Sequence, residues 1–222
     1  MTQSFVESES EKIAKITNIN RAYHVSLSKD YSTIGIDEQA RLLKIYDFLQ
    51  EHSVSCLYHF TDIYNLANIA DSGGLFSWKE CNERNIQISA PGGSDYSHQL
   101  DKIYCLEDYV HLSFCLNHPM MHVAMREGRI QYPVIFEIDP LVACIQSVYF
   151  SNINAVDKNH QIDNSVEILQ SIPFEIFSKH YFDLSDSQRP FYQAEILVPK
   201  LVHHDFFLKI IDKDGITPLW CF

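Results

Sequence analysis

The run FYQAEILVPK, residues 191–200, places a carboxylate at the start of an apolar segment. Glu195 follows Gln193 by two residues, so in an extended chain both side chains project from the same face. A carboxylate fixed in a site can act in acid–base chemistry. An acid at the start of a strand is also typical of a solvent-exposed surface, so this pair alone leaves both interpretations open.

Three further groups of residues could carry chemistry. His59 and Thr61 occupy alternate positions of an apolar run, which places them on one face of a strand. Asn117 and His118 stand directly before a Pro and are typical of a helix-capping turn. Arg84 is the only Arg between His59 and His118. A phosphate-binding site would need such a guanidinium, although an isolated Arg is usually exposed.

Metal and thiol chemistry are less well supported. His118 and His122 have the i, i+4 spacing of two metal ligands on a helix, but no third ligand lies beside them, so we expect no metal site. The six cysteines are scattered without a C-x-x-C pair, which predicts reduced thiols in a cytosolic protein. Cys115 lies inside an apolar run and is interpreted as inert packing.

Composition limits the class of protein. The 222 residues correspond to one domain, or one domain with an appendage. Only 17 Lys and Arg stand against 29 acids, for a net charge of −12, which argues against stable coating of nucleic acid but not against a transient enzyme. No apolar run is long enough to span a membrane, and the polar N-terminus is not a secretory signal. A cytoplasmic location is therefore expected.

The elements that must position these residues follow from periodicity and turn signals. Residues 1–10 are predicted to be disordered, and residues 76–109 to be irregular. Helices are predicted at 36–52 with Asp37 as the cap, after Thr61 or Asp62, at 116–128, and at 166–182 with a break at Pro173. Strands are predicted at 56–60, 110–115, 132–139, 147–152, 193–199, 206–212 and 217–222. This order favours an α+β fold with a mostly antiparallel sheet.

Three of these segments, in this order, resemble the motifs of the DarT family of nucleic-acid base ADP-ribosyltransferases. LYHFTDIYNLANIADSGGL is similar to the opening motif, with its Tyr-His-hydrophobic-Thr strand end and Gly-Leu turn. VHLSFCLNHPMMHVAMREG is similar to the second motif, although Asn117-His118 stand where the family usually has Arg-Ser. YQAEILVPKLV resembles the third, in which Gln-Ala-Glu opens a strand.

The resemblance implies an ADP-ribosyltransferase fold, with two packed, mostly antiparallel sheets around an NAD cleft. It implies a transferase domain over residues 55–222; residues 1–54 match no motif of the family and are expected to form an N-terminal helical extension. The expected activity is that of a toxin that moves ADP-ribose from NAD to thymine or guanine of single-stranded DNA. RNA bases or a protein remain alternative acceptors, and a non-catalytic acidic interaction module is a further alternative. A macrodomain-type antitoxin is the expected partner.

The resemblance also assigns roles to residues on the NAD side. His59 and Thr61 would hold the nicotinamide-ribose part of NAD, and Asn65 would contact the cofactor from the first helix. Arg84 is the candidate for the family's loop arginine, which acts on the NAD phosphates and in catalysis. Glu195 would be the catalytic glutamate.

The acceptor side is expected around the polar loop 183–192. Gln193 would orient the acceptor, and the side chains that precede it would border the substrate. The substrate-binding residues predicted in this way are Arg189, Phe191, Tyr192, Gln193 and His118. Aromatic side chains in such a loop can stack on an unpaired base.

Overall fold

A computed structural model of the chain describes residues 7–214 and 218–221. Its strands form one eight-stranded sheet in the order β10-β9-β4-β1-β3-β7-β5-β6 and a two-stranded sheet, β2-β8. The paired strands are antiparallel throughout. The strands are β1 (Leu57–Asp62), β2 (Gly74–Phe76), β3 (Tyr109–Ser113), β4 (Pro133–Ile138), β5 (Tyr149–Ser151), β6 (Ile162–Asp163), β7 (Glu195–Pro199), β8 (Leu201–His203), β9 (Phe207–Asp212) and β10 (Pro218–Cys221).

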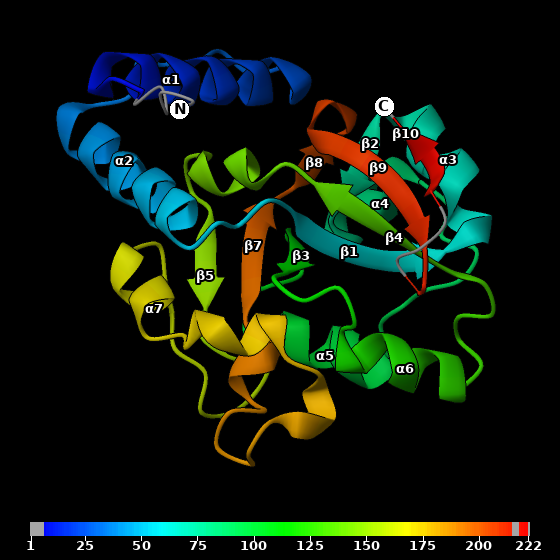
Figure 1. Cartoon of the computed structure of the whole chain (residues 1–222). Helices are drawn as coiled ribbons and strands as arrows, with labels where there is room; N and C mark the ends of the chain where they lie inside the picture. The colour runs from blue at the N-terminus through cyan, green and yellow to red at the C-terminus, as the bar shows by residue number, and fades with distance from the viewer. Residues whose placement is uncertain (1–6, 215–217, 222) are drawn as a thin grey trace.

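Helices surround this sheet on both sides (Figure 1), with α1 and α2 along one side and α5 and α6 on the other. The α-helices are α1 (Glu9–Ser26), α2 (Ile36–Glu51), α3 (Leu66–Ser72), α4 (Trp78–Arg84), α5 (Asp95–Ile103), α6 (Pro119–Arg126) and α7 (Val166–Gln170). Short 3-10 helices are η1 (Ile63–Asn65), η2 (Pro140–Cys144), η3 (Phe174–Ser178), η4 (Tyr181–Asp183), η5 (Phe191–Gln193) and η6 (His204–Phe206). The α+β class and the antiparallel pairing predicted from the sequence are confirmed.

The large sheet is nearly divided in the middle. Strand β1 pairs with β4 over its whole length, but with β3 only through the residue pair Tyr58↔Ser113. Strand β3 in turn pairs with β7 over all five of its residues. The sheet therefore consists of two four-stranded halves, β10-β9-β4-β1 and β3-β7-β5-β6, joined at a junction that we call the seam. The strands thus form one continuous eight-stranded sheet and a two-stranded sheet, and the arrangement of two sheets packed around an NAD cleft stays a prediction.

The N-terminal helices begin where local capping allows. Ser8 accepts a hydrogen bond from the Glu11 backbone N–H, and the Glu11 carboxylate accepts one from Ser8 N, which forms a capping box. The prediction of disorder over residues 1–10 is therefore wrong from residue 8 onward; residues 1–6 lie outside the described part. Helix α2 starts after Gly35, so Asp37 lies in its first turn and is not the cap that the sequence predicted.

These two helices share a core with the sheet. Ile16 of α1 and Ile45 of α2 belong to the same buried apolar cluster as Ile196 of β7. The buried Asn20 side chain donates to the carbonyls of Ile16 and Cys144, so it ties α1 to η2. Burial of each large aliphatic side chain contributes roughly 1.5–3 kcal/mol. A division of the chain at residues 54 and 55 stays a prediction.

Residues 76–109 are more ordered than the sequence predicted. Ser77 accepts from the Glu80 backbone N–H and caps α4, and Ser94 accepts from Ser97 and caps α5. Helix α4 has only seven residues, which is too short for a clear apolar period. The pairing of β2 with β8 depends on Gly74, because a Cβ at this position would lie 2.3 Å from the Val202 carbonyl oxygen.

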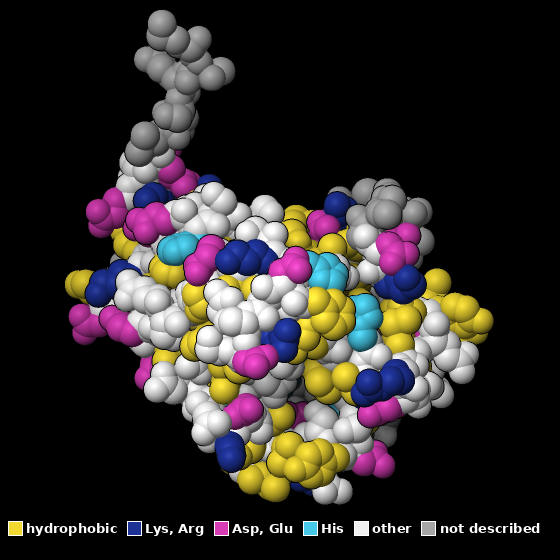
Figure 2. Space-filling view, turned by 60° about the horizontal axis from the view of Figure 1, so that its bottom comes forward, with side chains coloured by type: hydrophobic (Ala, Val, Ile, Leu, Met, Phe, Trp, Pro, Cys, Tyr) yellow, Lys and Arg dark blue, Asp and Glu magenta, His cyan; other side chains and the backbone are white. Residues whose placement is uncertain are grey.

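The distribution of charged side chains on the surface agrees with the acidic composition of the chain. Figure 2 shows basic side chains scattered among acidic ones over one face of the molecule, without a continuous basic tract on that face.

In the described residues, no helix is long and apolar enough to cross a bilayer. The cysteines whose side chains are described are free thiols, namely Cys56, Cys81, Cys105, Cys115 and Cys144. The side chain of Cys221 lies outside the described part.

Candidate active site

A cavity of about 560 Å³ lies at the seam. His59 and Thr61 of β1 line it from one half of the sheet, and His111 of β3 and Glu195 of β7 line it from the other. The predicted alternation of β1 explains the first pair, since residues two apart face the same side. The seam therefore brings together two of the motifs that the sequence singled out, although about 135 residues separate them along the chain.

Glu195 is the first residue of β7 and is buried. Its Oε2 accepts a hydrogen bond from His111 Nδ1 at 2.7 Å, and its Oε1 accepts one from Asn154 Nδ2 at 3.2 Å. On the neighbouring strands, Ser113 of β3 and Ser151 of β5 pair with Glu195 in register. The carboxylate is thus fixed from both sides, which distinguishes it from a solvated surface charge.

His111 carries a positive charge beside this carboxylate. Burial alone would lower the pKa of His111, but the charge and hydrogen bond of Glu195, together with Asp101, raise this pKa to about 9. The second ring nitrogen, Nε2, lies 4.0 Å from Asp101 Oδ1. At neutral pH the site therefore contains an imidazolium between two carboxylates.

His59 is held in one tautomer. Its Nδ1 donates to the His111 backbone carbonyl at 3.0 Å, a contact that also crosses the seam. Burial lowers the pKa of His59, so the ring is neutral at pH 7. With the proton on Nδ1, Nε2 is an acceptor that can receive a hydrogen bond from a ligand.

Asn65 lines the cavity, but its amide is used within the protein. Its Nδ2 donates to Thr61 Oγ1 at 2.9 Å and to the Ala90 carbonyl at 2.8 Å. Its Oδ1 accepts from the backbone N–H groups of Ser89 and Ala90. Asn65 therefore fixes the segment after α4 against β1, so that it shapes the cavity wall; direct contact with a cofactor stays a prediction.

The end of β1 is fixed by a second buried polar residue. The Asp62 carboxylate accepts hydrogen bonds from the backbone N–H groups of Tyr64, Gln131 and Tyr132, at 3.0, 2.7 and 3.0 Å. Burial opposes the charged form, but these three donors hold the pKa of Asp62 below its usual range. Asp62 thereby joins β1, η1 and the start of β4, and it holds His59 and Thr61 in place.

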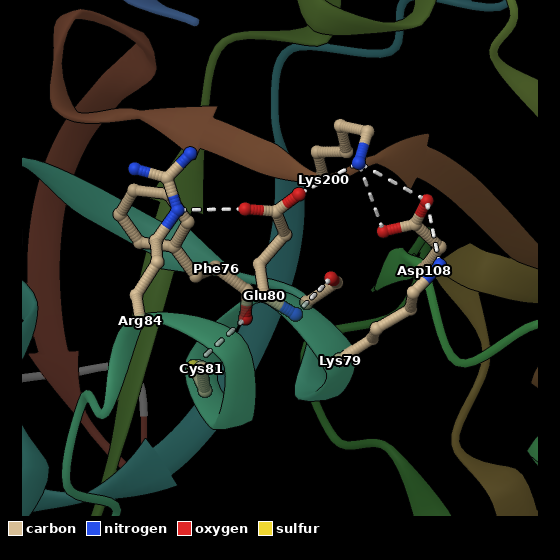
Figure 3. A network of polar contacts seen from close by, with 8 residues as sticks. Phe76, Lys79, Glu80, Cys81, Arg84, Asp108 and Lys200 are labelled. Atoms are coloured by element: carbon tan, nitrogen blue, oxygen red, sulfur yellow. Dashed lines mark hydrogen bonds and ion pairs between the residues drawn. The ribbon is translucent and has the colours of Figure 1, made fainter.

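Arg84 is the last residue of α4, and not a loop residue as the sequence predicted. Its Nε donates to Glu80 Oε2 at 2.6 Å, and its guanidinium lies 4.8 Å from the ring centre of Phe76 (Figure 3). Lys200 donates to the other oxygen of Glu80 at 2.6 Å and lies 3.3 Å from Asp108. Arg84 does not line the cavity, whereas Phe76 does. The structure thus places Arg84 beside the cavity wall, paired with Glu80 and apart from Glu195.

Gln193 and His118 both line the cavity. His118 caps α6 by accepting from the Met120 backbone N–H, and its ring stacks on Phe60 with 5.9 Å between centroids. Burial lowers the pKa of His118 to about 4, so this ring is neutral at pH 7. With Nδ1 as the acceptor of the cap, Nε2 carries the proton and can donate to a ligand.

The other residues predicted for the acceptor side do not line the cavity. Tyr192 is buried, and Phe191 packs against the same small apolar cluster. Arg189 donates to Asp186 at 2.7 Å. Directly before this loop, Phe182 is an exposed aromatic side chain, at 77% exposure. The predicted roles of Arg189, Phe191 and Tyr192 stay untested.

His111, Asn154 and Asp101 were missed by the sequence reasoning. His111 lies two residues before Ser113 within an apolar run, and a lone His in such a run is usually structural. Its contact with Glu195 spans 84 positions, and that of Asn154 with Glu195 spans 41. No local pattern marks such contacts, so only the strand pairing could have revealed them.

Comparison with known proteins places this chain in a family. A sequence model described as "ssDNA thymidine ADP-ribosyltransferase, DarT" matches residues 58–215. A search of curated protein sequences found no match.

Solved structures of DarT proteins share the fold. DarT of Thermus sp. 2.9 in complex with ADP-ribosylated ssDNA has a TM-score of 0.60 at 19% identity, over 71% of this chain and 81% of that chain. The same protein in complex with NAD+ has a TM-score of 0.53 at 20% identity, with the same coverage. DarTG of Thermosipho africanus in complex with ADP-ribose has a TM-score of 0.59 at 20% identity, over 70% of this chain and 43% of that chain. Because the family model covers well over half of the sequence, this chain belongs to the DarT family of ssDNA thymidine ADP-ribosyltransferases.

Proposed function

We propose that this chain transfers ADP-ribose from NAD to a base of single-stranded DNA and releases nicotinamide. The observation that carries the proposal is the fixed Glu195 carboxylate, held by His111 and Asn154 in a cavity that His59 and Thr61 line from the other side of the seam. This arrangement occurs in a chain of the DarT family.

The donor groups of the cavity fit NAD. A cavity of about 560 Å³ is within the range of small-molecule sites. Neutral His59 offers an acceptor and Thr61 a hydroxyl, which suit the ribose and carboxamide groups of the nicotinamide half. Aromatic side chains of the wall, such as Phe60 and Trp78, suit flat rings. Arg84 would serve the phosphates by exchanging its partner Glu80 for a phosphate oxygen.

Glu195 would act on the reacting ribose. When the bond between ribose C1′ and nicotinamide breaks, the electron pair leaves with nicotinamide and positive charge develops on the ribose. A carboxylate fixed beside that charge stabilises it, and a group of this kind is worth about 10²–10³ in rate. A base nitrogen then bonds to C1′, and its proton passes to Glu195 or to water.

The acceptor must reach the cavity past the segment around η4 and η5. The net charge of −12 argues against tight non-specific binding to DNA, so recognition would rest on a few local contacts. Exposed Phe182 can stack on an unpaired base, and Gln193 lines the cavity next to Glu195. The Thermus DarT complex that contains ADP-ribosylated ssDNA favours DNA as the acceptor.

A DarT-family enzyme of this kind would act as a toxin inside the cell that makes it. We therefore propose a macrodomain-type antitoxin as its partner, in line with the DarTG structure that contains ADP-ribose. Co-expression of a macrodomain that removes ADP-ribose from DNA should restore growth. Unchanged toxicity in its presence would argue against this partner.

Incubation with NAD and oligonucleotides tests the activity. Single-stranded DNA oligonucleotides that differ only in one central base, and RNA of the same sequence, are digested after reaction and their nucleosides are weighed by mass spectrometry. We expect one ADP-ribose on thymidine or deoxyguanosine. Glu195→Gln should lose the adduct, whereas Glu51→Gln, on the exposed last turn of α2, should not. A wild type that binds NAD but modifies no DNA would overturn the proposal, and an adduct on RNA or protein would reassign the acceptor.

A further inference from the structure

The Glu195 carboxylate has two unequal partners. His111 holds Oε2 at 2.7 Å, whereas Asn154 contacts Oε1 at 3.2 Å through a neutral amide. The first contact is short and charge-assisted, and the second is at the long end of the hydrogen-bond range. Oε1 is therefore the oxygen that can exchange its partner for a substrate group.

We propose that His111 is a positioning residue that fixes Glu195 by holding Oε2, so that Oε1 is left to act on the ribose and the base. This role rests on the proposed function of the site. It assigns a task in the reaction to a residue to which the family resemblance gave no role.

The strand register explains how His111 reaches Glu195. His111 of β3 lies opposite Leu197 of β7, and Glu195 is two residues from Leu197 on the same strand. His111 and Glu195 are therefore diagonal neighbours on one face of the sheet, a distance that long side chains can bridge. The backbone carbonyl of His111 also accepts from His59, so the strand that carries His111 is itself tied across the seam.

The surroundings favour the charged form of His111. The titratable groups that face it are Glu195 on β7, Asp101 and His98 on α5, His59 on β1 and His118 before α6. Burial lowers the pKa values of the three other histidines, and none of them adds a positive charge at neutral pH. The two carboxylates therefore outweigh the cost of burying the imidazolium.

The pH dependence follows from this balance. The pKa of His111 is raised to about 9, so the ring is charged at pH 7 and loses its charge as the pH rises through 9. A neutral ring still donates from Nδ1, but the hydrogen bond is weaker because neither the charge nor the attraction between the ions remains. The hold on Glu195 should therefore weaken above pH 9.

Two substitutions at His111 separate positioning from folding. His111→Asn keeps a donor near the place of Nδ1 but cannot titrate, and His111→Ala removes the donor. His122→Asn, at an exposed position of α6, is the matched control. Initial rates of nicotinamide release and of DNA modification are measured between pH 6 and pH 10.5, with thermal unfolding of each variant as the check of folding.

We expect His111→Ala to lower kcat by about 10- to 100-fold at pH 7.5, with KM for NAD changed less than about threefold, because a misplaced carboxylate slows the chemical step more than binding. His111→Asn should recover part of kcat and should lack the alkaline decline near pH 9 that the wild type shows. His122→Asn should match the wild type. Equal kcat for the wild type and folded His111→Ala, or an unchanged alkaline decline in His111→Asn, would overturn the positioning role.

NMR titration of the histidine rings gives a readout that needs no turnover. The His111 signal should titrate near pH 9 and shift toward the ordinary value in Glu195→Gln; titration near 6.5 in the wild type would refute the ion pair. A wild type that yields no DNA adduct but releases nicotinamide in a His111-dependent way would overturn the DNA acceptor and support the positioning role. Equal adduct formation by the wild type and by folded His111→Ala would support the DNA acceptor and overturn the positioning role.

Discussion

The buried carboxylate of Glu80 binds two cations, one on its own helix and one 120 residues away along the chain. It accepts from Arg84 on its own helix and from Lys200 between β7 and β8, each at 2.6 Å. Glu80→Gln keeps the shape of the side chain but removes its negative charge. The new amide can offer its oxygen to only one of the two cations, so its NH₂ group faces the other. We expect this single change to destabilise the fold, because Glu80 is only 5% exposed and water cannot replace the lost acceptor.

The size of the effect follows from the exposure of the two cations. The Lys200 side chain is 28% exposed, and a hydrogen bond to a charged group is worth about 1.5–3 kcal/mol. The Arg84 side chain is 47% exposed, so its pairing is worth only about 0.2–1 kcal/mol. The free energy of unfolding should therefore fall by about 2–3 kcal/mol, which for a chain of this length corresponds to a Tm lower by roughly 5–10 °C.

Thermal unfolding at several pH values is the assay, with Glu83→Gln as the control because it makes the same change on the exposed face of the same helix. Burial opposes the charged form of Glu80, but Lys200 and Arg84 hold its pKa below the usual value of 4.5. The contribution of the carboxylate is thus complete above pH 4.5 and is lost as the pH falls through the lower folded value. The difference between wild type and Glu80→Gln should shrink in acid. A Tm of Glu80→Gln equal to that of Glu83→Gln at pH 7 would refute the reasoning.

Three further substitutions have defined outcomes. Asp62→Ala leaves three backbone N–H groups without their acceptor, so the free energy of unfolding should fall by about 3 kcal/mol in urea titrations at pH 7, and by less in acid. Equal stability of the variant and the wild type would contradict the role of Asp62 in fixing the end of β1. Gly74→Ala should prevent stable folding, because its Cβ would lie 2.3 Å from the Val202 carbonyl oxygen. The control Gly35→Ala, whose Cβ meets nothing within 4 Å, should fold. A soluble Gly74→Ala variant that unfolds cooperatively would show that β2 can shift. Phe182→Ala should weaken single-stranded DNA binding by about tenfold in a fluorescence titration without a change in Tm, and unaltered affinity would exclude base stacking at this residue.

The parts of the fold that local signals determine were predictable from the sequence. Gly73 ends α3 in the left-handed conformation, and Pro119 stands in the first turn of α6, because both positions depend on backbone geometry alone. The apolar run before Pro199 became β7, with Glu195 at its start, although the predicted strand began at Gln193 and the structure places Gln193 in η5. Placing the three motifs in order was also sufficient to identify the family, although each of them is weak.

Features that depend on long-range pairing were not predictable in this way. Helix α4 is short and has little apolar period, and its buried Glu80 finds Lys200 at a separation of 120 residues. The environment of Glu195 likewise depends on the register of β3 against β7, which places His111 beside it. Arg84 was expected in a loop because the capping role of Ser77 gives no signal that distinguishes it from an ordinary loop serine.

The seam between β1 and β3 has a mechanical consequence. A ladder reduced to the one pair Tyr58↔Ser113 offers little resistance to local opening, so hydrogen exchange should be faster there than within β4 or β7. The two halves that meet at this junction each carry part of the cavity wall, His59 on one and Glu195 on the other. A ligand that contacts both walls would therefore hold the two halves of the sheet together. Filling the cavity would stabilise the closed seam against local opening, so that the eight-stranded sheet would unfold as one cooperative unit.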